Sequence, residues 1–378
     1  MPKRGNSEGS IRQRPNGTWE ARLTVAGRQR SIYGDTRADV AAKLKLLLAD
    51  QERGLLVYGP KQTVAQFLAT WLADVAKPKV RERTYIRYES LVRLHVAPAI
   101  GDVALGKLTA QHIVTMHKKI GETVSPRTVG HAHRVLHTAL ETAVRWGYVA
   151  RNIAELVDPP KVTKPEMRFL TAEQARQLLD TARATGHPDE ALYTLLLATG
   201  LRLGESLGLR WSDVDLAAGT LSVRRSVHRL PGKGFVFAPP KTKRSERTLS
   251  LAPFAVEALK RQRVHQNTQR LKAGDLWDAG DLVFANAVGR PRELQEMARR
   301  SFRPLLASAG LPAVRIHDLR HSAASLLLAL GVHVKIVSEM LGHSTTAITL
   351  DTYSHTVPSL QRDATNRLGD LLGGTNSG

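Results

Sequence analysis

Residues 316–324, IHDLRHSAA, place two histidines and an arginine within about one helical turn. His317 and His321, four residues apart, have the spacing of a zinc-binding helix. His317 and Arg320, three residues apart, project from the same face of a helix and could both donate hydrogen bonds to one anion such as a phosphate. The third interpretation is that the stretch belongs to an ordinary core.

The neighbouring residue types argue against a metal. Asp318 follows the first histidine, and its carboxylate is one methylene shorter than the glutamate base of zinc proteases. Arg320 would put a permanent cation beside a divalent ion. The chain has no cysteine, which excludes disulfides and thiolate zinc sites. We therefore favour the anion-binding interpretation and expect neither a metal nor another cofactor.

A second group of reactive residues follows in the stretch VKIVSEMLGHSTTAITLDTYSH. We expect a helix that ends at Gly342, then His343 in a loop, then a helix capped by Ser344 that leads to Tyr353. Taken singly, His343 could be a loop residue and Tyr353 a half-buried core aromatic. Together with His317 and Arg320 they form a pattern that is harder to attribute to packing.

The composition points to a polyanionic partner. The 378 residues carry a formal charge of +21, spread along the whole chain, and 42% of them are hydrophobic, enough for more than one core. Nucleic acid is the favoured partner, and the alternative is a basic surface such as that of a ribosome-associated protein. The sequence contains no apolar run of about 18 residues and no signal-peptide pattern, so we expect a cytoplasmic protein.

Short alternating segments predict a small sheet near the N-terminus. Residues 10–33, with turns at Asn16-Gly17 and Ala26-Gly27, should form a three-stranded meander, followed by a helix from about Thr36 to Gly54. An arginine-rich sheet can enter a major groove, although a solvated face is the alternative. The arginines that we expect to contact DNA are Arg12, Arg14, Arg22, Arg28 and Arg30.

Helical periodicity dominates residues 63–157, where Thr63 and Ser125-Pro126 mark helix starts. The spacing of its histidines is irregular, so packing or phosphate contacts explain them better than a metal. They are His112, His117, His131, His133 and His137. Residues 158–169 contain three prolines and read as a linker. Beyond it come helices that include residues 190–211, then a β-rich patch, then helices to the C-terminus.

With these elements in place, the chain resembles the tyrosine recombinase family, the phage-integrase type of DNA breaking and rejoining enzyme. The resemblance rests on five motifs: TGLRLGESLGLRW with Arg202, PKTKRSERTLSL with Lys241, HDLRH with His317 and Arg320, LGHS with His343, and DTYSH with Tyr353. Lys243 and Arg244 lie close enough to be alternatives to Lys241.

The resemblance implies a multidomain fold that is mainly α-helical with small β-sheets. Residues 1–55 would be an arm-type DNA-binding domain, a three-stranded sheet plus a helix. Residues 63–157 would be a SAM-like helical core-binding bundle, residues 158–169 the linker, and residues 170–378 an α+β DNA breaking–rejoining catalytic domain with a C-terminal helix. That helix would dock on its own or a neighbouring subunit.

The resemblance also implies a mechanism. Tyr353 would attack a phosphodiester and form a 3′-phosphotyrosyl intermediate, while Arg202 and Arg320 stabilise the developing charge. His317 would be the acid/base, Lys241 would protonate the leaving 5′ oxygen, and His343 would hydrogen-bond the phosphate. Glu205, three residues after Arg202, should orient an arginine.

The resemblance implies double-stranded DNA attachment sites as the partner, a homotetramer on DNA, and an accessory excisionase or DNA-bending protein. No membrane is implied. The setting would be the nucleoid of a bacterial host. Two alternatives stay open. One is a non-catalytic DNA-binding regulator, because residues 320–350 imitate a helix-turn-helix with Gly331 at the turn. The other is a type IB topoisomerase that relaxes DNA. A phage integrase and a transposase of the same chemistry cannot be separated by sequence.

Overall fold

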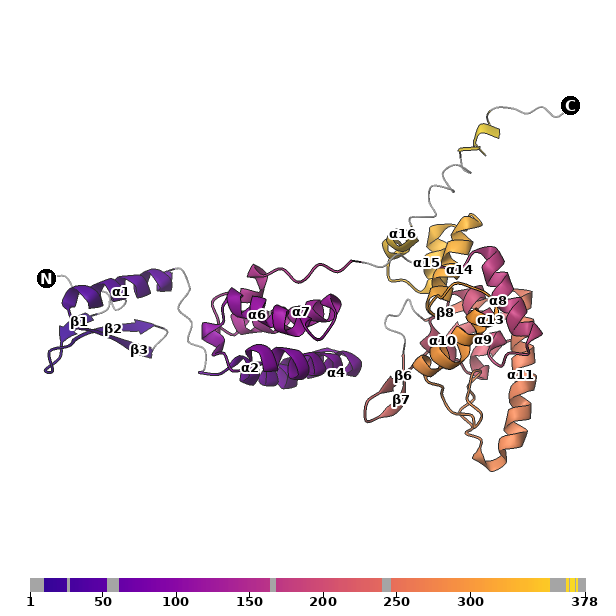
Figure 1. Ribbon diagram of the computed structural model, residues 1–378, viewed down its shortest axis with the longest axis horizontal. Coiled ribbons are helices and arrows are strands. Elements are labelled where there is room, and N and C mark those ends of the chain that lie inside the picture. The colour runs from indigo at the N-terminus through magenta and orange to yellow at the C-terminus, as the bar shows by residue number, and fades with distance from the viewer. Residues whose placement is uncertain are drawn as a thin grey trace. The chain divides into compact units, whose positions relative to one another are not determined.

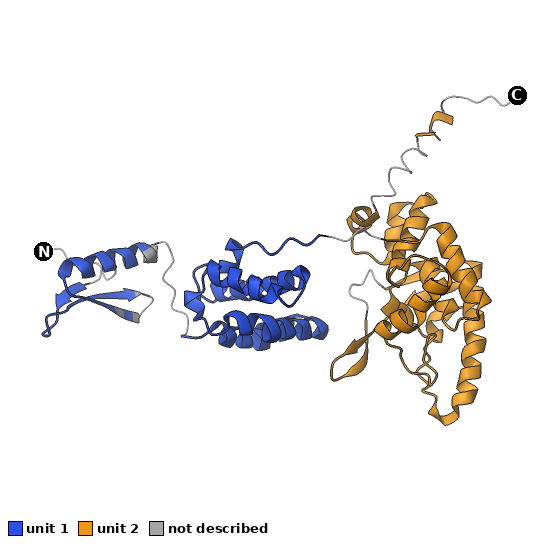
Figure 2. Ribbon diagram, viewed as in Figure 1, with its two compact units in different colours: residues 1–164 blue, residues 165–378 orange. Residues whose placement is uncertain are grey.

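The computed structural model describes residues 10–25, 28–52, 61–163, 168–239 and 246–353, with short pieces at 365–366, 368–370 and 372. Contacts divide the chain into two compact units, residues 1–164 and 165–378 (Figure 2). The described residues are mostly helical with small antiparallel sheets, which confirms the predicted fold class. The division into three domains and a linker stays a prediction. No helix in the described ranges has both the length and the apolar character needed to cross a bilayer.

An antiparallel sheet covered by one helix begins the described chain (Figure 1). Its elements are β1 (Ser10–Gln13), β2 (Trp19–Val25), β3 (Arg28–Gly34) and α1 (Arg37–Glu52), with the strands in the order β1-β2-β3. Ala21 and Leu23 of β2 pack with α1 in a small apolar core. Because side chains alternate along a strand, Glu20 and Arg22 lie on the opposite face. The predicted meander and helix are confirmed.

A helical bundle follows from residue 63. Its helices are α2 (Val64–Trp71), α3 (Lys77–Lys79), α4 (Glu82–Leu91), α5 (Ala97–Ile100), α6 (Ala110–Gly121) and α7 (Pro126–Arg145), with 3₁₀ turns η3 (Leu105–Lys107) and η4 (Ile153–Leu156). Thr63 caps α2 as predicted: its hydroxyl accepts from Gln66 N at 3.3 Å, and the Gln66 side chain accepts from Thr63 N at 2.9 Å. Ser125 occupies the N-cap of α7, but its hydroxyl contacts the Thr128 hydroxyl at 3.2 Å and makes no side-chain cap.

Prolines shape three long helices in the same way. The π-helical segments η1 (Leu72–Ala76), η2 (Val92–Val96) and η8 (Ala298–Phe302) each end two residues before a proline. Those prolines are Pro78, Pro98 and Pro304. A proline has no N–H and its ring crowds the carbonyl four residues earlier. A wider π turn just before the ring relieves that contact, so the helix continues past the proline instead of ending.

The second unit contains many helices, one small sheet and a two-stranded hairpin that projects from the helices (Figure 1). Its helices are α8 (Ala172–Ala184), α9 (Glu190–Thr199), α10 (Leu203–Leu207), α11 (Pro253–Ala273), α12 (Leu294–Met297), α13 (Arg303–Ser308), α14 (Asp318–Ala329), α15 (Val334–Leu341) and α16 (Thr346–Tyr353). Strands β4 (Val214–Asp215), β5 (Thr220–Val223) and β8 (Arg247–Ser250) form one antiparallel sheet. Strands β6 (Ser226–Leu230) and β7 (Gly234–Ala238) form a hairpin.

Helix α9 lies in the core of this unit. Almost all of its side chains are buried, in contact with α8, α11 and α14, which explains its continuous apolar sequence. The prediction of helix throughout residues 190–211 is wrong in two respects, because the helix is broken after α9 and α10 ends at Leu207. Gly200 takes φ +64° and ends α9, and the chain turns before α10 begins. That break positions Arg202.

Candidate active site

Arg202 lies at the junction of α9 and α10. Gly200 ends α9 in the left-handed conformation that glycine tolerates, and Arg202 is the N-cap of α10 with extended backbone. Glu205 accepts hydrogen bonds from the Arg202 backbone N at 3.1 Å and from its Nη1 at 2.7 Å. Glu205 therefore orients both the backbone and the guanidinium of Arg202, as the sequence predicts.

Arg320 joins the ends of two helices. Its side chain leaves the first turns of α14 and is only 3% exposed. Nη1 donates to the carbonyl oxygen of Gly200 at 2.8 Å, and Nη2 donates to that of Leu341 at 2.7 Å. Arg202 Nη2 reaches the next carbonyl, that of Gly342, at 3.4 Å. The C-terminal carbonyls of α9 and α15 thus bring the two predicted arginines to one place.

Arg247 is a second buried arginine beside Arg320, and sequence reasoning missed it; the Arg202 side chain is 40% exposed. Arg247 begins β8, and its Nη2 donates to Glu205 at 3.0 Å while its Nε donates to the Met340 carbonyl at 2.6 Å. Its side chain is 8% exposed. The only signal in the sequence is its position in the PKTKRSERTLSL motif, where other basic residues stand close by. Glu205 therefore lies between Arg202 and Arg247.

The charges in this cluster do not balance. Burial lowers the pKa of Arg320 to about 9, and the charge of Arg202 lowers it further than Glu205 restores it. Burial likewise lowers the pKa of Arg247. Burial raises the pKa of Glu205, but the charges of Arg247 and Arg202 lower it by more and hold it below its ordinary value. One carboxylate faces three guanidiniums, so an anion bound here would relieve their repulsion.

His317 and His343 stand at the border of the cluster. His317 is the N-cap residue of α14 and is exposed, and His343 follows Gly342, which ends α15 at φ +64°. His343 Nδ1 lies 2.8 Å from the Thr349 hydroxyl. Desolvation first, then neighbouring His321 and Arg320, lower the pKa of His317 to about 4. Desolvation and the nearby arginines lower that of His343 to about 4. Both rings are therefore neutral near pH 7.

Tyr353 ends α16 and is buried. It is 1% exposed and packs with Leu328, Val337 and Leu341. Its hydroxyl lies 2.8 Å from His321 Nδ1. Burial raises the pKa of Tyr353 to about 12, although the charge of Arg320 acts in the opposite direction. Gly342 ends α15 and a helix leads to Tyr353, as predicted, whereas the cap by Ser344 stays a prediction.

Several predicted residues fall outside the described ranges. Lys241 and its alternatives Lys243 and Arg244 lie between β7 and β8 in residues 240–245. The side chains of Arg28 and Arg30 are likewise not described, nor is most of the predicted C-terminal helix after residue 353. Their roles stay predictions.

The open face of the N-terminal sheet carries the other predicted arginines. Arg12 Nε and Arg22 Nε donate to Glu20 at 2.8 and 3.0 Å. Arg14 lies over the ring of Tyr33, with 5.3 Å from its guanidinium carbon to the ring centroid. The hydrogen bond from Arg22, then one from Ser31, lowers the pKa of Glu20 to about 2. Arg12, Arg14 and Arg22 are therefore arranged around one anion and one aromatic ring.

Among the described residues one group has metal-like spacing, and it is not the predicted catalytic one. Ligand atoms of His137, Glu141 and Glu155 lie within 4.8 Å of one another. The carboxylates approach opposite nitrogens of the ring, at 3.7 and 3.9 Å, and are 51% and 59% exposed. Ion pairs on a solvated face explain this geometry. Nearby, His117 Nε2 and His133 Nδ1 are 3.0 Å apart, a packing contact between α6 and α7.

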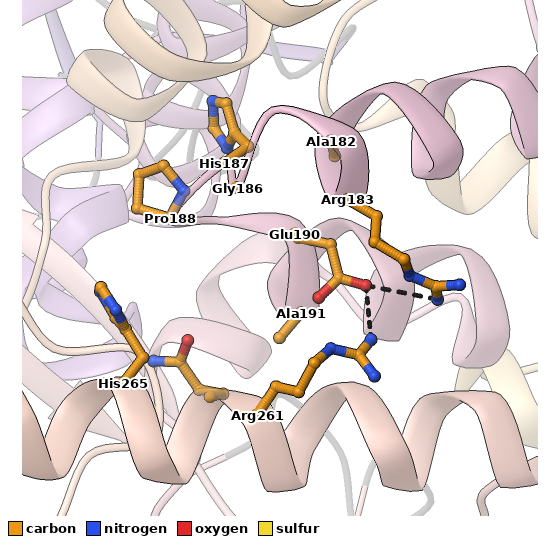
Figure 3. Close-up of a pocket in the computed structure, with 10 residues that line it drawn as sticks. Ala182, Arg183, Gly186, His187, Pro188, Glu190, Ala191, Arg261 and His265 are labelled. Carbon is orange, nitrogen blue, oxygen red and sulfur yellow. Dashed lines mark hydrogen bonds and ion pairs between the residues drawn. The ribbon is translucent and has the colours of Figure 1, made fainter.

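Figure 3 shows a pocket bordered by α8, α9 and α11. Its acidic residue, Glu190, accepts a hydrogen bond from Arg261 at 2.8 Å and lies 3.7 Å from Arg183. The cations that line the pocket are therefore already paired. None of the predicted catalytic residues within the described ranges lines it. A backbone phosphate of duplex DNA meets a protein at its surface, so an enclosed pocket is not required for this chemistry.

Comparison with known proteins supports the motif assignment. The Phage integrase family model matches residues 168–359, and the model for the phage integrase N-terminal SAM-like domain matches residues 63–120. An integrase of Streptomyces ambofaciens is 33% identical, over 88% of this chain and 86% of its own. A tyrosine recombinase XerC-like protein of Caldanaerobacter subterraneus is 28% identical, over 91% of this chain and 92% of its own.

Solved structures share the fold. The Tn1549 transposon integrase in complex with transposon right end DNA superposes with a TM-score of 0.69 at 22% identity, over 82% of this chain and 100% of that one. A lambda integrase tetramer bound to a Holliday junction superposes with a TM-score of 0.56 at 18% identity, over 89% of this chain and 96% of that one. The fold, the motifs and the family match agree: the chain belongs to the phage integrase family and is a tyrosine-type site-specific recombinase.

Proposed function

We propose that this recombinase cuts and rejoins duplex attachment sites through a covalent bond between Tyr353 and a DNA 3′ phosphate. The observation that carries the proposal is a cluster of arginines in which Arg320 and Arg247 are buried and Arg202 is partly exposed. Arg202 and Arg320, from different helices, reach adjacent backbone carbonyls at the ends of α9 and α15. Burial raises the pKa of Tyr353, and the charge of Arg320 opposes that increase, which supports placing nucleophile and cation in one site.

The chemistry follows from the charge. Attack by a phenolic oxygen puts negative charge on the non-bridging oxygens of phosphorus, and fixed donors aimed at those oxygens stabilise the transition state. Guanidiniums stay charged and present paired donors, so Arg202 and Arg320 can do what Mg²⁺ does in other phosphoryl-transfer enzymes. The phosphotyrosyl bond conserves the energy of the broken phosphodiester, so rejoining needs no nucleotide.

The remaining roles are assigned by resemblance. His343 hydrogen-bonds the scissile phosphate, and His317, exposed beside it, contacts the same group or moves a proton. Lys241 protonates the 5′ oxygen that leaves. A 5′ hydroxyl from a second duplex then attacks the phosphotyrosyl bond and releases Tyr353, which completes one strand exchange.

The recombinase would assemble on DNA as a homotetramer. The solved lambda integrase tetramer on a Holliday junction supports that assembly, and the Tn1549 integrase bound to transposon end DNA supports DNA as the partner. The sheet arginines Arg12, Arg14 and Arg22 would contact arm-type sites. An excisionase or a DNA-bending protein would set direction. The protein would act at the nucleoid of a bacterial host, on behalf of a phage or another mobile element.

The test uses nicked suicide substrates that carry candidate attachment sites. The wild-type protein should form a DNA adduct that survives denaturation, and mapping should find the DNA on the peptide that contains Tyr353. Tyr353→Phe should form no adduct while its DNA affinity stays within about twofold, because one buried hydroxyl contributes little to phosphate contacts. A regulator would keep its function in this variant, and adducts on any other residue would refute the assignment.

Two further measurements separate the alternatives. Cleavage should persist in excess chelator, and a requirement for added divalent ion would contradict catalysis by arginines alone. A topoisomerase would relax supercoiled plasmids of any sequence equally fast. The recombinase should instead form adducts preferentially at its own sites.

A further inference from the structure

The two histidines of the HDLRH motif have different neighbours, and of these two only His321 hydrogen-bonds the Tyr353 hydroxyl within the described part of the chain. His321 Nδ1 lies 2.8 Å from the hydroxyl of Tyr353, the oxygen that attacks DNA in the proposed function. His317, one turn earlier, is exposed, and its ring meets that of His321 edge to face with centroids 5.2 Å apart. His321 is half-buried and so borders both the buried Tyr353 and the exposed His317.

We infer that His321, rather than His317, accepts the proton of Tyr353 during strand cleavage. The inference rests on the proposed function and deepens it, because it names the base of the same site. A neutral imidazole with its proton on Nε2 has a free lone pair on Nδ1, which accepts the hydrogen bond from the phenol. His321 thereby touches the reacting oxygen and is a catalytic residue.

The step balances in atoms and charge. A bond forms between Tyr353 Oη and phosphorus, and the bond between phosphorus and the 5′ oxygen breaks. The phenolic proton moves to His321 Nδ1, which becomes an imidazolium. The 5′ oxygen takes its proton from a separate acid, Lys241 or water, and the reverse reaction returns the first proton from His321 to Tyr353.

The surroundings of His321 favour a neutral base. Burial is the largest influence and lowers the pKa of His321. Of the charged groups on its own helix and the preceding loop, Asp318 raises the pKa of His321, while Arg320 and Arg315 lower it. The other titratable neighbours are His317 on the same helix, Tyr353 of α16 and His343 of the loop after α15.

A basic residue with a lowered pKa stays unprotonated at neutral pH. His321 is then ready to receive a proton, and cleavage should slow only as the pH falls below the ordinary imidazole pKa of about 6.5. In this proposal His317 contacts the phosphate and not the phenol, so replacing His317 should leave this loss of rate at low pH, the acid limb, unchanged.

The decisive variant is His321→Asn. Its Oδ1 occupies the place of Nδ1 and can still accept the Tyr353 hydrogen bond, but an amide cannot take up a proton near neutral pH. Single-turnover cleavage of a nicked suicide substrate, with protein bound beforehand, should be followed between about pH 5 and pH 9. His321→Asn should cleave about 100-fold more slowly than wild type at neutral pH and lose the acid limb.

Three variants complete the experiment. His317→Asn should slow cleavage but keep the acid limb. His265→Asn, an exposed histidine of α11, should match wild type throughout. Thermal unfolding and DNA affinity are measured for each protein, and if His321→Asn unfolds, His321→Gln replaces it in the same assay.

The outcomes are distinguishable. If His321→Asn keeps the wild-type rate and acid limb, or cleaves faster, His321 is not the base, and a faster rate would make it a restraint on Tyr353. If His317→Asn is the variant that loses the acid limb, the inference is also wrong. In each of these cases Tyr353→Phe still forms no adduct and the proposed function stands. Adducts formed by Tyr353→Phe would instead remove the proposed function itself.

Discussion

Two regions of this protein are built on the same motif, a glutamate held between two arginines. In the N-terminal sheet Glu20 accepts from Arg12 and Arg22, which are 53% and 35% exposed. In the catalytic unit Glu205 accepts from Arg202 and Arg247. Both glutamates are nearly inaccessible, at 2% and 5% exposed. The difference lies in what covers them.

Glu20 is covered by the solvated side chains that it binds, whereas Glu205 is bound by one partly exposed arginine, Arg202 at 40%, and one buried arginine, Arg247 at 8%. Arg12 and Glu20 are direct cross-strand neighbours, so the pairing of β1 with β2 is enough to create their contact. Arg247 comes from β8 and is held additionally by the carbonyl of Met340. In the proposed function, the sheet cluster would rearrange around a groove, while the cluster around Glu205 would keep its donors fixed before the phosphate arrives.

The largest effect should come from Arg320→Lys. Lysine keeps the charge but cannot bridge the carbonyls of Gly200 and Leu341 as the planar guanidinium does. Loss of one preorganised donor slows such reactions by about 100- to 1,000-fold, and we expect that reduction in single-turnover cleavage with DNA affinity nearly unchanged. The matched change in the sheet, Arg22→Lys, should weaken DNA binding a little and leave cleavage of bound substrate alone. Equal cleavage by both variants would remove the distinction between fixed and adaptable arginines.

The next effect concerns stability. Glu205→Gln leaves Arg247 buried without its counter-charge, and breaking a buried pair in this way lowers the free energy of unfolding by about 3 kcal/mol. Glu20→Gln should lower the free energy of unfolding much less, because water can solvate Arg12 and Arg22. Calorimetry of both variants tests this, since each should shift a different unfolding transition. A larger shift for Glu20→Gln would mean that the sheet cluster is the more rigid one.

The same contrast explains what could be predicted from the sequence. The meander, helix α1, the cap at Thr63 and the helix start at Pro126 depend on residues close in the chain, and these predictions were correct, whereas the predicted cap by the Ser125 side chain does not form. The break at Gly200 was missed, because the apolar pattern continues on both sides of it. Only tertiary contacts show that Arg320 needs the carbonyl exposed by that break.

The candidate site was predictable as a set of residues but not as an arrangement. Motif resemblance identified Arg202, Arg320 and Tyr353, yet it could not indicate that Tyr353 would be buried against α14 and α15. Arg247 was missed, and His321 was considered only as a metal ligand, because each stands beside residues of the same type and only their contacts distinguish them. Contacts between residues far apart in sequence are set by packing, which local patterns do not encode.

A smaller effect should follow from glycines in the two regions. Gly342 and Gly17 both have positive φ, +64° and +82°, and an added methyl group disfavours that conformation by about 1 kcal/mol. At Gly342 the new Cβ would also lie 2.8 Å from Arg247 Nη1, whereas at Gly17 nothing lies within 4 Å. Gly342→Ala should therefore be less stable than Gly17→Ala and cleave more slowly, while Gly17→Ala should cleave normally. Equal cleavage rates would show that the position of Arg247 does not matter to catalysis.

The smallest effect is the response of the two clusters to acid. A carboxylate whose pKa is lower in the folded than in the unfolded protein stabilises the fold above the unfolded value, about 4.3, and loses that contribution as the pH falls through the folded value. Hydrogen bonds from Arg22 and Ser31 place the folded pKa of Glu20 at about 2, and Arg247 and Arg202 also lower that of Glu205. Both contributions should therefore disappear on acidification below about pH 4.3, and neither should change between about pH 7 and pH 5.

Unfolding temperatures measured at steps below that pH, for wild type and for the two glutamine variants, resolve the contributions. Each difference between wild type and variant should shrink with acid, and it should shrink by more degrees for Glu205→Gln because water and salt screen the exposed Glu20 cluster. Added salt should reduce the Glu20 difference and leave the Glu205 difference nearly unchanged. If salt reduced both equally, the catalytic cluster would be open to solvent in solution, and its arginines would have to be ordered by the DNA they bind.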